Sequence, residues 1–351
     1  MPRSTLSFRE QIGGRLTDFL GDEGLVCGPT QSMLSTLVGA LANYKEEGVV
    51  LTPTVLMCDS IEEVLRTIPT AIRYQIGTAK LDENAARKIL KECAGLAAGD
   101  WFVYIEKKDA GYNFGVAASS GGPIAVSLSE AIRIRENGFA FIVKRIAEST
   151  VELVGAKGQE LSLVFSTMRE TPAHSAEGAI RKFVHQCTLR IESSESKKNF
   201  IVYLERMLTR VLEASHGTIL ICFSEGRLDG VNELSELVAI NPAIGLYKAF
   251  CDFLSDPSAE ALVRLQNFES LLGGLVNSDG IVALSDSADV VAYRGFFKPS
   301  EAVAHSEGAS PPIIGGARRR AFEGVCACIG AILICALFRS QDGLILIRCQ
   351  E

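Results

Sequence analysis

The chain has 351 residues, a length that allows two domains with separate cores. Its 35 basic and 42 acidic side chains give a net charge of −7, which argues against general binding to nucleic acid or to an anionic membrane surface. Ten cysteines without a Cys-x-x-Cys pair, and an amino terminus without a signal-peptide core, predict reduced thiols in a cytoplasmic protein and argue against a structural zinc site.

Helices and strands alternate in the first part of the chain, which is typical of an α/β fold. The expected elements are helices over 7–21, 29–48, 60–69 and 84–96, a strand over 49–59, and hairpins over 100–119 and 150–166. Ser60 is the expected N-cap of its helix, and Glu63 is spaced to complete a capping box. We expect a separate α+β domain over residues 1–190, with the polar run Ser193 to Lys198 as the clearest linker signal.

Residues 191–351 are expected to form a second domain. Its predicted elements are a helix over 199–215, a strand over 217–224, a mostly helical stretch over 233–275, a hairpin over 280–297, a helix from 317, and strands over 331–338 and 344–349. The apolar run Val325 to Phe338 is shorter than the roughly 20 residues that a membrane helix needs. It is therefore expected to be a buried helix that leads into a core strand, with no membrane span.

Three consecutive arginines, Arg318 to Arg320, stand at the start of the helix from 317. The start of a helix carries partial positive charge, so cations are unfavourable there unless an anion binds between them. The unpaired N–H groups and the guanidinium groups together suit a phosphate. The alternative is a surface patch in which the arginines pair with Glu323 or Glu301.

Asp279-Gly280 directly precedes the predicted hairpin over 280–297. A carboxylate at the start of a strand, beside a glycine that permits close approach, is suited to hold Mg²⁺ or Mn²⁺ on a nucleotide phosphate. The same pair of residues also occurs commonly as a simple turn.

The order of these motifs resembles the diadenylate cyclase domain, over about residues 200–351. The family's Asp-Gly-Ala motif is matched by Asp279, Gly280 and Ile281, and its Gly-Thr-Arg-His-Arg-Ala motif by the run from Gly316 to Ala321. The resemblance implies that two ATP molecules are condensed into cyclic di-AMP with release of pyrophosphate, by two protomers that meet face to face. It also implies that a sensory or regulatory module precedes the cyclase domain.

The roles that the resemblance implies can be given residue by residue. Asp279 would hold the metal, and Arg318 and Arg320 would bind phosphate and act in catalysis. The other expected nucleotide-binding positions are Gly280, Ile281, Gly316, Ala317 and Arg319.

The sequence departs from the family pattern at several positions. Ala317 replaces a phosphate-facing threonine, and Arg319 replaces the histidine between the two arginines. The acidic residue expected before the last turn is missing, because Arg339 and Ser340 stand there. Three functions therefore stay open: a sensor-gated cyclase, a module that binds a nucleotide or cyclic dinucleotide without turnover, and a structural interaction domain.

Overall fold

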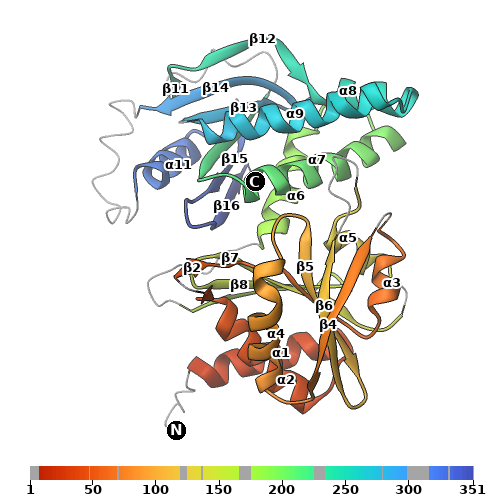
Figure 1. Cartoon of the computed structure of the whole chain (residues 1–351). Coiled ribbons are helices and arrows are strands. Elements are labelled where there is room, and N and C mark those ends of the chain that lie inside the picture. Colours follow the sequence, from red (N-terminus) through yellow and green to blue (C-terminus); the bar gives the residue numbers. More distant parts are fainter. Residues whose placement is uncertain are drawn as a thin grey trace. The chain divides into compact units, whose positions relative to one another are not determined.

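The structure is a computed structural model that describes residues 8–46, 48–68, 71–118, 125–135, 137–165, 175–224, 234–278, 280–298, 316–330 and 333–350. The chain divides into two compact units, Met1–Thr171 and Pro172–Glu351 (Figure 1). Each unit is built on its own mixed seven-stranded sheet in the described part of the chain. This arrangement confirms the predicted mixed α/β class.

The sheet of the first unit has the order β4-β6-β5-β3-β7-β8-β9. Its strands are β3 (Val55–Cys58), β4 (Ile72–Lys80), β5 (Trp101–Lys108), β6 (Gly111–Ala118), β7 (Ala140–Ala147), β8 (Thr150–Gly155) and β9 (Glu160–Val164). Only β3 and β5 pair in parallel among the described strands of this sheet, and the other neighbours are antiparallel. The short strands β1 (Lys45–Glu46) and β2 (Val49–Val50) form a separate pair.

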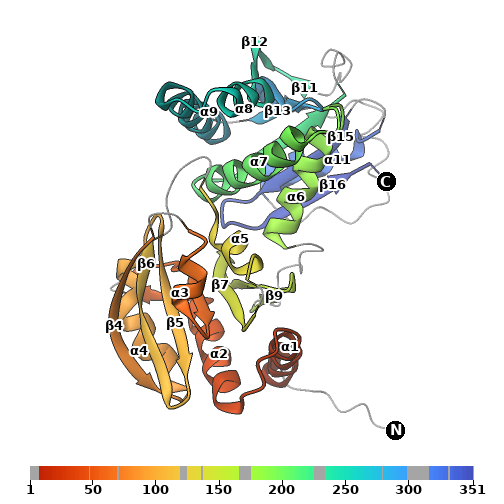
Figure 2. The same ribbon diagram turned by 90° about the vertical axis from the view of Figure 1, so that its right-hand side faces the viewer.

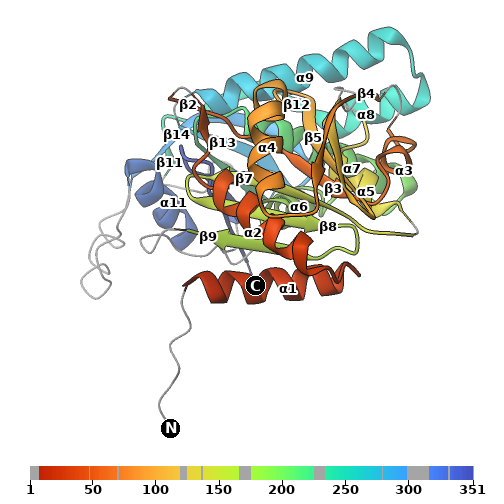
Figure 3. The same ribbon diagram turned by 60° about the horizontal axis from the view of Figure 1, so that its bottom comes forward.

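Both faces of this sheet are buried, which explains why β3 is apolar throughout. Its alternate side chains enter different clusters, Val55 and Met57 on one face and Leu56 and Cys58 on the other. The helices of the first face are α1 (Phe8–Asp22), α2 (Gly28–Leu41) and α4 (Asn84–Cys93), with the short η1 (Ala94–Leu96) after α4 (Figure 3). The helices of the second face are α3 (Ile61–Leu65) and α5 (Leu128–Arg133).

The sheet of the second unit has the order β11-β14-β13-β10-β15-β16, and β12 also pairs with β14. The strands are β10 (Thr218–Phe223), β11 (Leu234–Ser235), β12 (Val238–Gly245), β13 (Ile281–Ser285), β14 (Asp289–Phe297), β15 (Leu333–Arg339) and β16 (Ile345–Cys349). The central strands β10 and β13 are parallel, and the other pairs are antiparallel. Because β10 and β13 run in the same direction, the segments that lead into them reach the sheet at the same edge.

Helices cover both faces of this second sheet as well. They are α6 (Ala176–Cys187), α7 (Glu195–Glu213), α8 (Leu246–Ser255), α9 (Ala259–Asn277) and α11 (Ala317–Ala327). Helix α6 packs against β10, β15 and β16. Figure 2 shows α6 beside β16. Helix α11 packs against β10, β14 and β15, where Phe322 stacks on Phe338 with ring centroids 5.3 Å apart.

Several predicted boundaries differ from the structure. The stretch over 233–275 is not mostly helical from its start, because β12 precedes α8 and pairs with β14. The serine-rich run is not a linker, because Ser194 caps α7 by accepting a hydrogen bond from the Lys197 backbone N–H at 3.1 Å. Ser60 caps α3 as predicted, whereas the Glu63 carboxylate pairs with Arg135 at 2.9 Å.

The sequence predicts a domain boundary between residues 190 and 191, whereas the boundary between the compact units lies between Thr171 and Pro172. The reason is α6, which packs on the strands of the second unit and lies within it.

Candidate functional site

Several motif residues meet at one edge of the second sheet, where β10 and β13 begin. These strands are parallel and in register, with Ile219 opposite Ile281, so their amino ends lie side by side. At the start of α11, Nη1 of Arg318 donates a hydrogen bond to the backbone oxygen of His216 at 3.4 Å. Because His216 lies two residues before the start of β10, the contact brings the first turn of α11 to the same edge. We call this region the amino edge.

Gly280 lies at the amino edge with a backbone that only glycine adopts readily. Its φ is +113°, and a Cβ atom there would lie 2.7 Å from the Cα atom of Arg294 on β14. The sequence predicts that Gly280 permits a close approach. In the structure, the group that comes close to Gly280 is the backbone of β14. Ile281, the next residue, is buried in the core beneath α11. Asp279, the predicted metal ligand, lies outside the described residues.

The arginine run occupies the first turn of α11, as the sequence predicts. Gly316 is the N-cap, without a side-chain cap, and no acidic residue lies in the first turn. Ala317, Arg318 and Arg320 are exposed. The backbone N–H groups of this turn and the two exposed guanidinium groups therefore form a cationic helix start, the arrangement that favours an anion.

Arg319 differs from its two neighbours because it is largely covered. Its Nη2 atom lies 2.8 Å from Oε1 of Glu323, one turn further along α11. The predicted alternative, a salt bridge to Glu323, is therefore confirmed for this arginine. Glu301, the other partner considered, lies outside the described residues.

Arg339 stands where the motif pattern has an acidic residue, and it binds the end of a helix. Its Nη1 atom donates to the backbone oxygen of Ser215, and Nη2 donates to that of Glu213 at 3.3 Å. Both carbonyl groups belong to the carboxyl end of α7, where a cation is favourable. Burial lowers the pKa of the guanidinium. Arg339 thus joins α7 to the turn between β15 and β16.

Two residues of the amino edge were not singled out from the sequence, His216 and Asn277. The exposed His216 donates its backbone N–H to Oδ1 of Asn277 at 3.2 Å, which ties the end of α9 to the start of β10. The available signal was a histidine directly before a predicted core strand. That signal does not reveal which helix ends beside it.

A metal site of the usual kind is not seen in the described part of the chain, where no three or more His, Cys, Asp or Glu side chains are arranged to hold an ion. That search does not include Asp279. The described carboxylates therefore do not by themselves fit the Mg²⁺ or Mn²⁺ that the sequence pattern implies.

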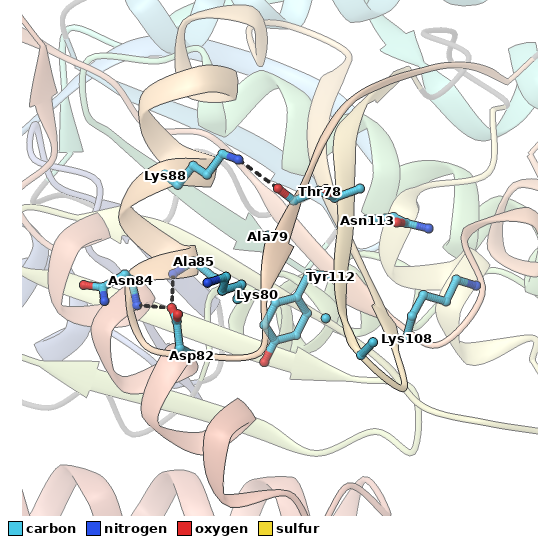
Figure 4. Close-up of a pocket in the computed structure, with 12 residues that line it drawn as sticks. Thr78, Ala79, Lys80, Asp82, Asn84, Ala85, Lys88, Lys108, Tyr112 and Asn113 are labelled. Carbon is cyan, nitrogen blue, oxygen red and sulfur yellow. Dashed lines mark hydrogen bonds between the residues drawn. The ribbon is translucent and has the colours of Figure 1, made fainter.

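The first unit contains a basic pocket of about 660 Å³ between α4 and the β5–β6 hairpin (Figure 4). Lys80, Lys88 and Lys108 line it together with Tyr112 and Asn113. Lys88 donates to the backbone oxygen of Thr78 at 2.8 Å, and Lys108 pairs with Glu106 at 2.9 Å. The walls thus offer ammonium and amide groups, which suit a small anion.

The start of α4 is already capped at the rim of this pocket. Oδ1 of Asp82 accepts hydrogen bonds from the backbone N–H groups of Asn84 and Ala85, at 2.9 and 3.2 Å (Figure 4). The lysine side chains, rather than the end of α4, therefore give the pocket its basic character.

Comparisons with protein-family models and with curated proteins found no match to this chain. No helix in the described ranges combines the length and the apolar character that crossing a membrane requires. The function is therefore inferred from the motif residues and from where the fold places them.

Proposed function

We propose that the chain is a nucleotidyltransferase of the diadenylate cyclase type, and that its second unit binds ATP at the amino edge. One observation carries the proposal. Gly280 and Arg318 are far apart in the sequence, and the fold brings both of them to the amino edge. The hydrogen bond from Arg318 to His216 and the register of Ile281 with Ile219 support it. The order of the motifs in the sequence does not by itself require these residues to lie close together.

In this proposal Arg318 and Arg320 bind the phosphates of ATP, together with the backbone N–H groups that open α11. Guanidinium groups suit this role because they are always charged and present several donors to phosphate oxygens. They would stabilise the negative charge that grows on the phosphates while the 3′-hydroxyl of one ATP attacks the α-phosphate of another. Pyrophosphate leaves, and two such steps close cyclic di-AMP.

Asp279 is the residue that would hold Mg²⁺ or Mn²⁺, which when bound would neutralise phosphate charge. The two ATP molecules must be presented to one another by two protomers, so the active form is a face-to-face homo-oligomer. Arg319, tied to Glu323, adds positive charge without being a metal ligand.

The first unit is proposed as the regulatory module. Its basic pocket is the place where a small organic anion would bind, because three lysines line it. A thermal-shift screen of nucleotides and small carboxylates should find a ligand whose effect is lost in Lys80→Ala. Stabilisation that persists in that variant would place the ligand elsewhere.

A second candidate function is a module that binds a nucleotide or cyclic dinucleotide without turnover. The observation that favours it is Arg339, because a residue that binds the carbonyl groups of Ser215 and Glu213 supplies no acid to the reaction. In that case the second unit would bind the phosphates of a nucleotide but would not catalyse the condensation of two ATP molecules.

Asp279→Asn separates the two candidates. In a cyclase the variant should lose turnover yet keep most of the binding that the arginines provide, because the amide no longer holds a cation on the triphosphate. In a metal-free binding module the same change should leave affinity unchanged or raise it, since a negative charge near the phosphates is removed. The measurement is calorimetric titration of wild type and variant with ATP, with and without Mn²⁺, and product analysis of the same samples.

A further inference from the structure

Three cysteines stand in one row across the second sheet. Cys222 on β10 is the register partner of Cys335 on β15, and Cys335 is the partner of Cys349 on β16. Cross-strand partners point to the same face of a sheet. Helix α6 packs over β10, β15 and β16, and its buried Cys187 interacts with Cys222.

Cys335 and Cys349 are in direct sulfur contact. Their Sγ atoms are 2.9 Å apart. The neighbouring residues form a hydrogen-bonded pair, because the Gln350 N–H donates to the Ile334 oxygen at 2.9 Å. Cys335 and Cys349 therefore occupy a non-hydrogen-bonded position, where Cα atoms are about 4.5 Å apart, inside the range that a disulfide spans.

The two thiols of this pair are chemically unequal. A hydrogen bond from the Cys335 thiol lowers the pKa of Cys349, and the positive charge of Lys182 on α6 acts in the same direction. That hydrogen bond and burial raise the pKa of Cys335. Cys349 lies on the edge strand β16 and is partly exposed, whereas Cys335 is fully buried. The pair thus consists of an accessible thiol with a lowered pKa and a buried thiol in contact with it, the arrangement of a reactive and a resolving cysteine.

We propose that Cys349 and Cys335 are a reversible redox pair, which hydrogen peroxide converts into a cross-strand disulfide. First, the Cys349 thiolate attacks one peroxide oxygen, the O–O bond breaks, and the second oxygen leaves with a proton as water. Cys349 is then a sulfenic acid. Next, the Cys335 sulfur gives up its proton and attacks the Cys349 sulfur, so that the S–S bond forms and a second water leaves. Two thiols lose two electrons, and hydrogen peroxide is reduced to two waters.

The other cysteines nearby are less suited to react first. Cys187 and Cys222 are completely buried. Cys326 on α11 is partly exposed, like Cys349, but burial raises its pKa to about 12, so it stays protonated at neutral pH. Cys326 is therefore the matched control, a cysteine of similar exposure whose pKa is raised rather than lowered.

The test is peroxide treatment of the folded full-length chain, alkylation of the remaining thiols, and tryptic mass spectrometry. Cleavage after Arg320, Arg339 and Arg348 places Cys335 in the peptide 321–339 and Cys349 in the carboxyl-terminal tripeptide. The expected product is a linked pair of these peptides, with fragment ions that assign the bond to Cys335 and with loss of the link after dithiothreitol. A link to Cys222, or no link in the folded protein, would overturn the proposal.

Two variants test the order of the steps. In Cys335→Ser, the sulfenic acid on Cys349 has no resolving thiol and should accumulate, so a dimedone adduct at Cys349 is expected. In Cys326→Ser, the disulfide should form at the wild-type rate. In the unmodified protein, Cys349 should react with iodoacetamide at least about tenfold faster than Cys326, because only the thiolate is nucleophilic. Equal alkylation rates of Cys349 and Cys326 in the wild-type protein would overturn the assignment even if the variants fail to fold.

Discussion

Arg318 and Arg320 are the two exposed arginines of the first turn of α11, and the proposed phosphate site depends on them. Arg318→Ala or Arg320→Ala should each weaken ATP or cyclic-dinucleotide binding by about 1.5–3 kcal/mol, the scale of a charge-assisted hydrogen bond. Isothermal titration calorimetry measures the loss directly. Stability should change little, since both side chains are exposed.

A matched control for these variants is Arg264→Ala. Arg264 is an exposed arginine of the same unit whose Nη1 lies 3.9 Å from Oδ2 of Asp252 on α8. Its removal lowers the net charge by the same amount at a different place. Equal affinities of wild type, Arg318→Ala and Arg320→Ala for the nucleotide would contradict the phosphate site. The arginines would then form only a surface patch.

Arg339 is predicted to matter for stability rather than for nucleotide affinity. Arg339→Ala removes the hydrogen bonds to Ser215 and Glu213 and leaves carbonyl groups at the end of α7 without this donor. The free energy of unfolding should fall by about 1.5–3 kcal/mol. Urea denaturation checks this value, with the exposed Arg348→Ala on β16 as control, for which a change within about 0.5 kcal/mol is expected. A loss of ATP binding in folded Arg339→Ala would contradict the purely structural role.

At the scale of elements, the sequence predicts best where local signals agree with tertiary packing. Helix α1 and the strands of the β5–β6 hairpin follow their apolar patterns and turn residues closely. Strand β12 does not, because most of Val238–Gly245 is exposed and its pairing with β14 is a contact between distant parts of the chain. The sequence predicts a linker at the serine-rich start of α7 because Ser194 is as typical of a loop as of an N-cap.

The contact between α1 and the β8–β9 hairpin depends on Glu23, which is almost fully buried. Its carboxylate accepts hydrogen bonds from the backbone N–H groups of Ala156 and Lys157, each at 3.2 Å. Burial nevertheless raises the pKa of Glu23 above its ordinary value of 4.5. The folded protein therefore holds this proton more tightly than the unfolded chain does.

The sign of the pH dependence follows from linkage. A carboxyl group with a raised pKa in the folded state contributes its full stability below the unfolded pKa, and this contribution is lost as pH rises through the folded pKa. Glu23→Gln removes the titration, so the difference in melting temperature between variant and wild type should grow in favour of the variant as pH rises above about 4.5. Thermal unfolding across pH 4 to 8 measures it. A constant difference would show that burial does not dominate at Glu23.

For the whole molecule, the sequence predicts two domains and the structure has two compact units, but the position of their boundary depends on α6. The amphipathic pattern of Ala176–Cys187 predicts the helix without revealing which sheet it covers. The candidate site has the same limitation. Spacing identifies Gly280 and the arginine run, while their convergence depends on the parallel pairing of β10 with β13, which no local pattern encodes.

We propose that the second unit binds ATP at the amino edge and joins two ATP molecules. The most direct measurement is incubation of the purified chain with ATP, and separately with GTP, in Mg²⁺ or Mn²⁺, followed by mass spectrometry of the products. We predict cyclic di-AMP and pyrophosphate from ATP, with neither product in the Arg318→Ala, Arg320→Ala double variant. An unchanged ATP pool, together with equal ATP affinity in wild type and the double variant, would contradict both the cyclase and the phosphate site at the amino edge.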